Sequence, residues 1–321
     1  MIAVTGAAGF IGSCLIGRLN ALSFEDVIAI DDFSSPNKLK NLNNKRLHGI
    51  VHRNDFADWI DANHRSVQHI FHLGARTDTV EKDRGIFDRL NLNYSKSVWK
   101  KCAEFGIPLT YASSAATYGD GFFSYADSHE IIKKLLPLNP YGQSKNDFDK
   151  WALTQDHQPP AWQGLKFFNV YGPNEYHKDR MASVIFHAFN QIRKTGSMRL
   201  FRSHRTDVKD GHQSRDFIYV QDILSICIFC MQRRPADGLY NAGTGHARTF
   251  LDLVRATFHA MDQDPSIEFI DTPADIRDTY QYFTEAKMDK LLSQGYTVPF
   301  HSLEQGVKQY VRDFLRDGNY Y

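Results

Sequence analysis

The chain has 321 residues, a formal net charge of +1 and four cysteines, and 42% of its residues are hydrophobic. This length favours one large domain or two closely joined ones. The balanced charge argues against a nucleic-acid partner, and the mean hydropathy of −0.44 argues against a membrane protein. Met1 leads straight into a strand-like segment without the features of a signal peptide, so we expect a soluble, cytoplasmic protein.

Short apolar segments alternate with helical patterns through the first half of the chain, which is typical of βαβ units and a parallel sheet. The predicted helices of this half span 10–22, 87–104 and 141–154. The fold class is therefore α/β, with a Rossmann-type doubly wound parallel sheet. The predicted strands span 2–5, 26–30, 49–52, 69–73, 109–112 and 164–168.

From Asn169 onward the elements become shorter, and their loops are rich in Gly, Pro, Asn and His. Helices are expected at 181–194 and 303–315. We expect residues 1–168, with returning segments near 213–245, to form a dinucleotide-binding domain. Residues 169–321 are expected to form mainly a smaller mixed α/β substrate-binding domain. The polar segment 203–214 is expected to be a mobile loop.

The closest pair of cysteines, Cys227 and Cys230, lies within an apolar helical segment. A zinc site would require a second pair or nearby histidines, and neither accompanies this one. We therefore expect both thiols to be buried in the core and predict no metal site.

A glycine-rich turn directly follows the first predicted strand and opens the first helix. Gly6, Gly9 and Gly12 are spaced three residues apart, and the acidic Asp31 ends the second strand. A tight turn, close approach of backbone to a pyrophosphate and N–H groups at a helix start explain this pattern. The residues expected to hold a dinucleotide here are Gly6, Gly9, Phe10, Ile11 and Gly12.

The choice between the two nicotinamide cofactors depends on charges after the second and third strands. Asp31, with the adjacent Asp32, could hold the ribose hydroxyls of NAD and would repel the 2′-phosphate of NADP. Lys38 and Arg53 could instead neutralise that phosphate. After the fourth strand, small residues let a cofactor lie against the backbone, in the run Leu73, Gly74 and Ala75.

Tyr141 and Lys145 lie one helical turn apart, so the lysine ammonium can approach the phenol. A phenol is a weak base at its ordinary pKa of about 10, and a nearby cation lowers that pKa. Tyr141 then becomes a usable general acid/base. The same spacing also occurs on solvated helices, so it does not establish an active site by itself.

Together with the glycine turn, the segments 111–119, 140–145, 169–173 and 215–222 resemble the extended short-chain dehydrogenase/reductase family over nearly the whole chain. The resemblance implies that Ser114 hydrogen-bonds the reacting oxygen. It also implies that Tyr141 is the acid/base and that Lys145 holds the nicotinamide ribose as well.

A narrower resemblance, carried by the segments 113–119, 168–178, 181–184 and 280–284, is to the ADP-glycero-manno-heptose 6-epimerases within that family. It implies oxidation at C6″ to a transient ketone and reduction from the opposite face, for the heptose of the lipopolysaccharide inner core. It also implies NADP, with NAD as the alternative, and a second acid/base at Lys178. Lys178 could otherwise be a loop lysine that binds substrate phosphate.

The same resemblance implies further contacts with cofactor and substrate. Asn93 and Asn169 are expected near cofactor and sugar, and His187 and Arg215 near the diphosphate. Phe201 and Tyr280 are expected at the far end of the substrate. Two of these residues have structural alternatives: Asn93 could tie its helix to a strand, and Arg215 could pair with Asp216 or Asp222.

Other functions of this scaffold are a sugar 4,6-dehydratase, a UDP-hexose 4-epimerase or related reductase, and a nucleotide sensor without turnover. Ala115 and Ala116 stand where a dehydratase would need carboxylates, which disfavours dehydration. Intact Ser114, Tyr141 and Lys145 argue against a mere sensor. The expected partners are a nucleotide-sugar substrate and further copies of this chain in a homo-oligomer.

Overall fold

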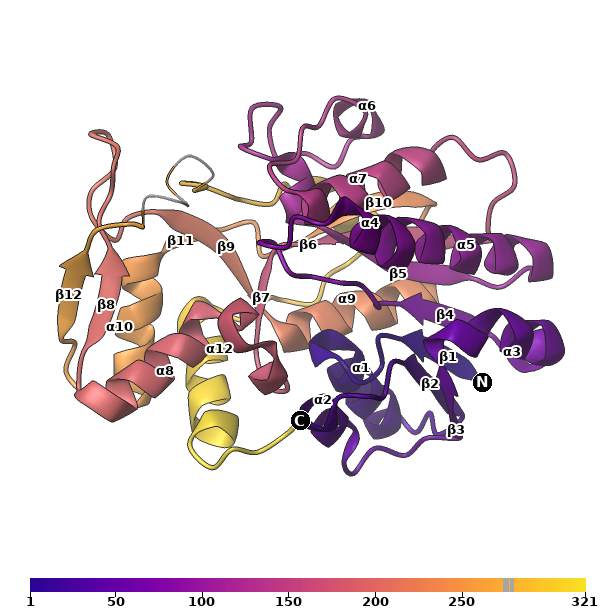
Figure 1. The fold of residues 1–321 in the computed structure, drawn as a ribbon, viewed down its shortest axis with the longest axis horizontal. Coiled ribbons are helices and arrows are strands. Elements are labelled where there is room, and N and C mark those ends of the chain that lie inside the picture. The colour runs from indigo at the N-terminus through magenta and orange to yellow at the C-terminus, as the bar shows by residue number, and fades with distance from the viewer. Residues whose placement is uncertain (274–276, 278–279) are drawn as a thin grey trace.

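Seven parallel strands form the central sheet, in the order β10-β6-β5-β4-β1-β2-β3 (Figure 1). The computed structural model describes residues 1–273, 277 and 280–321. Every residue of the first two strands is buried, as parallel strands covered by helices on both faces require. The strands of this sheet are β1 Ile2–Thr5, β2 Val27–Asp31, β3 Gly49–His52, β4 His69–His72, β5 Leu109–Ser114, β6 Trp162–Phe167 and β10 Gly238–Ala242.

Two layers of helices cover this sheet (Figure 1). In one layer α3, α5 and α7 contact one another in turn, and in the other α1 packs against α9. This arrangement confirms the predicted doubly wound sheet. The helices of this part are α1 Phe10–Ala21, α2 Pro36–Leu39, α3 Phe56–Asn63, α4 Arg84–Phe87, α5 Tyr94–Phe105, α6 His129–Ile132, α7 Pro140–Ala152 and α9 Val220–Arg233.

The six strands predicted in the first half all form, within two residues at either end. The helix expected over 87–104 differs, because it begins at Arg84 and contains the π-helix η4 Asp88–Asn93 between α4 and α5. Hydrogen bonds from i to i+5 widen the turn there, which changes the face that the following side chains present. An α-helical period read from the sequence does not include this shift.

A smaller part built from short strands and helices lies beside the sheet (Figure 1). β9 pairs with β7 in parallel and with β11 in antiparallel orientation, while β8 and β12 form a separate parallel pair. The elements of this part are β7 Asn169–Tyr171, β8 Met198–Phe201, β9 Ser214–Tyr219, β11 Ala247–Thr249, β12 Ile267–Ile270, α8 Val184–Thr195, α10 Phe250–Ala260, α12 Leu303–Gln309 and the π-helix η8 Tyr310–Leu315. The short helix α11 Asp289–Ser293 packs instead against β10 of the central sheet.

The helix expected over 181–194 begins three residues later, at Val184. The Ser183 hydroxyl accepts a hydrogen bond from the backbone N–H of Phe186, so Ser183 caps α8 and the residues before it form a separate turn. The helix expected over 303–315 forms as α12 and η8. The remaining short turns are the 3-10 helices η1 Lys40–Leu42, η2 Arg53–Asp55, η3 His64–Ser66, η5 Ala115–Tyr118 and η6 Tyr176–Met181.

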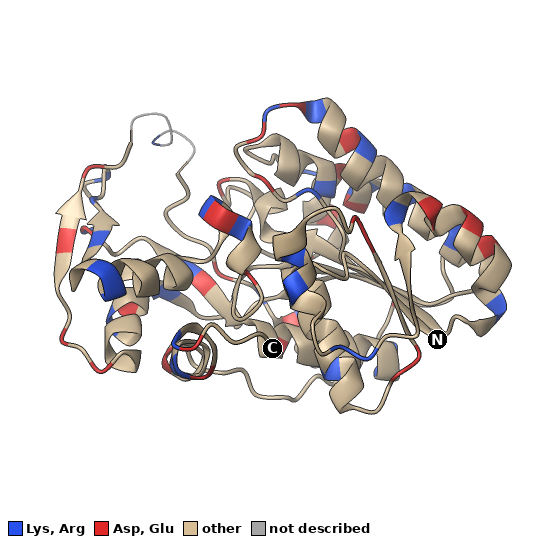
Figure 2. Cartoon of the chain, turned by 60° about the horizontal axis from the view of Figure 1, so that its bottom comes forward, with Lys and Arg blue, Asp and Glu red and all other residues tan. Residues whose placement is uncertain are grey.

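The charged side chains of both signs are interspersed along the helices rather than gathered on one face of this view (Figure 2). In the described residues, no helix has the length and apolar character needed to cross a membrane. Cys227 and Cys230 are free, fully buried thiols in α9, which confirms that they belong to the core.

Candidate active site

The glycine turn lies where the strand order reverses, between β1 and β4. Gly6 has a φ of +68°, and a Cβ on it would lie 2.6 Å from the Cα of Gly74. A Cβ on Gly12 would lie 2.2 Å from the carbonyl oxygen of Gly6. α1 starts directly afterwards and has no acidic residue in its first turn. The backbone N–H groups at this helix start therefore suit an anion such as a pyrophosphate.

A cavity of about 500 Å³ opens at this switch point. Its size and glycine-lined floor suit a dinucleotide, because a Cβ would fill the space beside the backbone. Of the predicted cofactor residues, those that line this cavity are Gly6, Gly9, Phe10, Ile11, Gly12, Asp31, Lys38, Arg53, Leu73, Gly74 and Ala75.

The charges at the ends of β2 and β3 are already paired within the protein. Lys38 Nζ lies 2.5 Å from Asp31 Oδ1, and Asp31 Oδ2 accepts a hydrogen bond from the backbone N–H of Ala8 at 2.9 Å. Arg53 pairs with Asp32 at 2.9 Å. Asp32 does not line the cavity itself, so its position supports Arg53 rather than a direct contact with the cofactor.

The position of Asn93 does not support its predicted contact with the cofactor. Asn93 is exposed and lines neither cavity, whereas Asn91 is 1% exposed. The Asn91 side chain accepts a hydrogen bond from the backbone N–H of Arg76 and donates to the Arg76 carbonyl and to Ser144. The π-helix η4 contains both asparagines, and its wider turn decides which of them faces inward.

A second cavity, of about 340 Å³, continues from the first. The predicted catalytic residues meet on its walls, and both cavities share Phe10, Leu73 and Lys178 among their lining. Among the described residues that line the second cavity there is no Asp or Glu. Of the predicted catalytic and substrate residues, those that line it are Ser114, Tyr141, Lys145, Asn169 and Lys178.

The acid/base pair lies at the start of α7, where Asn139 caps the helix and Pro140 begins it. Burial raises the pKa of the Tyr141 phenol, and a hydrogen bond with Ser114 opposes that shift. Burial lowers the pKa of Lys145 to about 8. Lys145 donates to the carbonyl of Ala112 at 2.7 Å rather than to the phenol, so its ammonium is held by the end of β5.

Lys178 reaches the same cavities from η6, in the smaller part of the fold. Its Nζ lies 5.4 Å from the centre of the Phe10 ring, and burial lowers its pKa while Glu175 opposes that shift. A lysine with a lowered pKa is deprotonated more often at neutral pH, and only the neutral amine can accept a proton. The buried Glu175 carboxylate anchors this segment by accepting hydrogen bonds from Ser183 at 2.6 Å and Tyr310 at 2.9 Å.

Arg215 and its aromatic neighbours form a group next to the second cavity. The Arg215 guanidinium lies 5.6 Å from the ring centres of Tyr280 and Phe250, and Phe250 lines the cavity. Phe201 packs edge-on against Tyr280 at 6.4 Å. Arg215 is only 7% exposed, and its guanidinium donates to the backbone carbonyls of Ser214 and Gln281. These bonds leave its positive charge uncompensated by any carboxylate of the described residues.

The structural alternatives for Arg215 do not hold. Asp216 accepts hydrogen bonds from Thr244 and Gly245, and Asp222 pairs with His301. His187, by contrast, is exposed on α8 and lines neither cavity, so its predicted diphosphate contact is not supported by its position.

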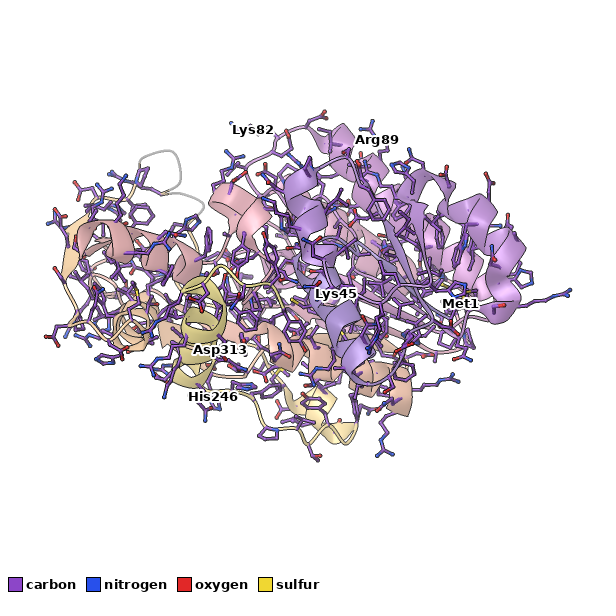
Figure 3. All side chains as sticks on the ribbon, turned by 90° about the horizontal axis from the view of Figure 1, so that it is seen from below. Met1, Lys45, Lys82, Arg89, His246 and Asp313 are labelled. Carbon is purple, nitrogen blue, oxygen red and sulfur yellow. The ribbon has the colours of Figure 1, made fainter. Side chains whose placement is uncertain are left out.

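Several cavity residues were not predicted from the sequence. His177 and Tyr94 line the first cavity, and so does Arg89, which is labelled at the upper edge of Figure 3. His177 immediately precedes Lys178, so its place in that motif could have identified it. No pattern in the sequence marks Arg89 or Tyr94, because η4 decides which way this helix faces.

Comparison with known proteins agrees with this geometry. Residues 2–243 match the NAD dependent epimerase/dehydratase family. Proteins named ADP-L-glycero-D-manno-heptose-6-epimerase from Fusobacterium nucleatum and Nitratidesulfovibrio vulgaris are 44% and 47% identical, with 98% of this chain and 98% of each relative covered. A crystal structure of the protein of that name from Helicobacter pylori superposes with a TM-score of 0.81 at 25% identity, covering 97% of this chain and 95% of the other. The chain thus belongs to the NAD dependent epimerase/dehydratase family.

Proposed function

We propose that this protein is an ADP-glycero-manno-heptose 6-epimerase that inverts C6″ of ADP-D-glycero-D-manno-heptose and so serves lipopolysaccharide inner-core synthesis. The observation that carries the proposal is that Tyr141 and Lys178, from two separate parts of the fold, line one cavity. The names and full-length identities of the two bacterial relatives support the same substrate.

Inversion at C6″ requires two groups that can accept and donate a proton, one for each position of the substrate oxygen. A bound nicotinamide cofactor would supply the hydride acceptor and donor. The substrate must then present C6″ to that cofactor by both faces, so its oxygen occupies two positions. Tyr141, which lines the second cavity together with Ser114, would hold the proton of the oxygen in one position, and Lys178 would do so in the other. The glycine turn and Lys145 would hold the cofactor, and Asn169 would contact the sugar.

We further propose NADP as the cofactor, with Lys38 and Arg53 turned toward its 2′-phosphate. The site could also take NAD, because Asp31 is placed at the end of β2 where ribose hydroxyls bind in this fold. Arg215 and Tyr280 would receive the nucleoside diphosphate. Residues 1–168 with the segment near 213–245 would serve the cofactor, and 169–321 mainly the substrate. The cytoplasmic location and the homo-oligomer stay predictions.

The test is incubation of the purified protein with ADP-D-glycero-D-manno-heptose, followed by NMR of the C6″ configuration. We expect inversion by the wild-type protein and none by Tyr141→Phe. UDP-glucose and UDP-galactose, supplied separately, should remain unchanged at C4″. Inversion of a UDP-hexose with no change in the heptose would replace the proposal with a hexose 4-epimerase.

A further inference from the structure

Lys166 of β6 and Asp149 of α7 form an ion pair behind the acid/base site. Lys166 Nζ lies 2.6 Å from Asp149 Oδ2, and both side chains are 0% exposed. Withdrawing two charges from water is costly, and apolar residues of similar size often replace such a pair without loss of stability. The retention of both charges therefore calls for an explanation beyond stability alone.

Each member of this pair also contacts other residues. The Lys166 ammonium also donates to Thr117 Oγ1 at 2.8 Å and lies 5.2 Å from the centre of the Tyr118 ring. The Asp149 carboxylate also accepts hydrogen bonds from Ser113 Oγ at 2.6 Å and from Tyr111 at 3.1 Å. A buried network with several hydrogen bonds holds its members in one arrangement.

The network connects the two elements that carry the acid/base residues. Asp149 follows Lys145 by one helical turn, as Lys145 follows Tyr141, so all three lie along one face of α7. On β5, Ser113 immediately precedes Ser114. The Thr117 hydroxyl accepts a hydrogen bond from Lys166 and donates one to the carbonyl of Ser114 at 2.8 Å.

We propose that the Lys166–Asp149 pair is a positioning device for the acid/base site, which joins α7 to the end of β5 and so sets Tyr141, Lys145 and Ser114 relative to one another. This inference rests on the proposed function in so far as it assigns the acid/base work to Tyr141. Lys166 and Asp149 line neither cavity and act only through the residues next to them.

The charges of the pair also act on the site. Asp149 raises the pKa of both Tyr141 and Lys145, against the opposing effects of Ser114 on the first and of burial on the second. The other titratable group that faces Lys145 is His72 of β4, which is fully buried and has a pKa lowered to about 3, so it stays neutral. Removal of Lys166 alone would leave the Asp149 charge uncompensated two helical turns from Tyr141.

The experiment compares Lys166→Met with the double variant Lys166→Met/Asp149→Leu. For Lys166→Met we expect kcat to fall about 100-fold with little change in KM, as misplacement of reacting groups does. The NMR signal of Tyr141 ¹³Cζ can be assigned by its loss in Tyr141→Phe. In Lys166→Met the midpoint of its pH titration should lie at higher pH than in the wild type. In the double variant the titration should return toward the wild-type position, while kcat stays low because the links to Ser113 and Thr117 are lost.

Asp222→Asn provides the matched control, because Asp222 is also a buried, ion-paired carboxylate, but its partner is His301 and not a residue of β5 or α7. It should lower the melting temperature and leave kcat and the Tyr141 titration unchanged. Wild-type kcat and an unshifted Tyr141 signal in folded Lys166→Met would overturn the proposal. If that variant does not fold, wild-type kcat in the double variant would overturn it. The NMR titration needs no substrate, so it reports on positioning even if the proposed epimerase activity is wrong.

Discussion

The Lys38 ammonium is already paired with the Asp31 carboxylate, at 2.5 Å, inside the cavity at the end of β2. A 2′-phosphate bound at this position would be attracted by the Lys38 ammonium and repelled by the Asp31 carboxylate. Cofactor preference therefore depends on the pair and not on either residue alone.

Lys38→Ala is expected to weaken NADP binding at least tenfold, about 1.4 kcal/mol, and to leave NAD binding nearly unchanged. The reason is that the 2′-phosphate loses a cation and also faces an unpaired Asp31. Isothermal titration of both cofactors measures the two affinities. Lys40→Ala, an exposed lysine outside the cavity, is the control. Equal losses of affinity for NAD and NADP would show that Lys38 does not recognise the 2′-phosphate.

Tyr141→Phe and Lys178→Met should each abolish epimerisation, because inversion needs one proton-handling group for each position of the C6″ oxygen. At least one variant should still dismutate a substrate analogue oxidised to an aldehyde at C6″, since that reaction can use a single base. Steady-state kinetics with equal cofactor occupancy measures both activities. A Lys178→Met protein with a raised KM and wild-type kcat would instead identify Lys178 as a phosphate-binding residue.

Gly12→Ala should destabilise the protein by about 3 kcal/mol, because the new Cβ would overlap the backbone of the cofactor turn. Cofactor binding should fall with it. Gly49→Ala is the control, since a Cβ there makes only an ordinary contact at 3.4 Å with the Ile28 side chain. Urea unfolding of both variants measures the difference in their free energies of unfolding. A Gly12→Ala protein as stable as Gly49→Ala would show that the turn can relax.

His72 should make the protein less stable in mild acid. Burial lowers its pKa to about 3, and it contacts the hydroxyls of Thr5 and Ser95 at 2.7 and 2.8 Å. The unfolded state, with an ordinary pKa of about 6.5, binds a proton that the folded state does not, so stability present above pH 6.5 is lost as pH falls toward 3. The expected loss from this group at pH 5 is about 2 kcal/mol relative to neutral pH.

Urea unfolding at pH 7 and pH 5 measures this effect, and the comparison with His72→Gln isolates it from other titrating groups. The loss between the two pH values should be about 2 kcal/mol smaller in the variant, whatever its absolute stability. An identical loss in both proteins would mean that His72 becomes protonated without unfolding.

The sequence by itself predicted the sheet and the cofactor turn, because both depend on local properties. Continuous apolar segments identify buried parallel strands, and the spacing of Gly6, Gly9 and Gly12 reflects a backbone turn that a Cβ would block. Tyr141 and Lys145 share one helix, so their proximity also follows from spacing alone. These predictions needed no knowledge of contacts between distant segments.

Only the tertiary structure decided the relationships that join distant segments. The π-helix η4 turned Asn91 inward and Asn93 outward, which an α-helical period cannot foresee. Asp149 and Lys166 are 17 residues apart on different elements, and only the packing of α7 on the sheet brings their charges together. Arg215 likewise lacks a carboxylate partner in the described residues because the fold directs Asp216 to other donors. Such pairings depend on three-dimensional packing, which local propensity and spacing do not specify.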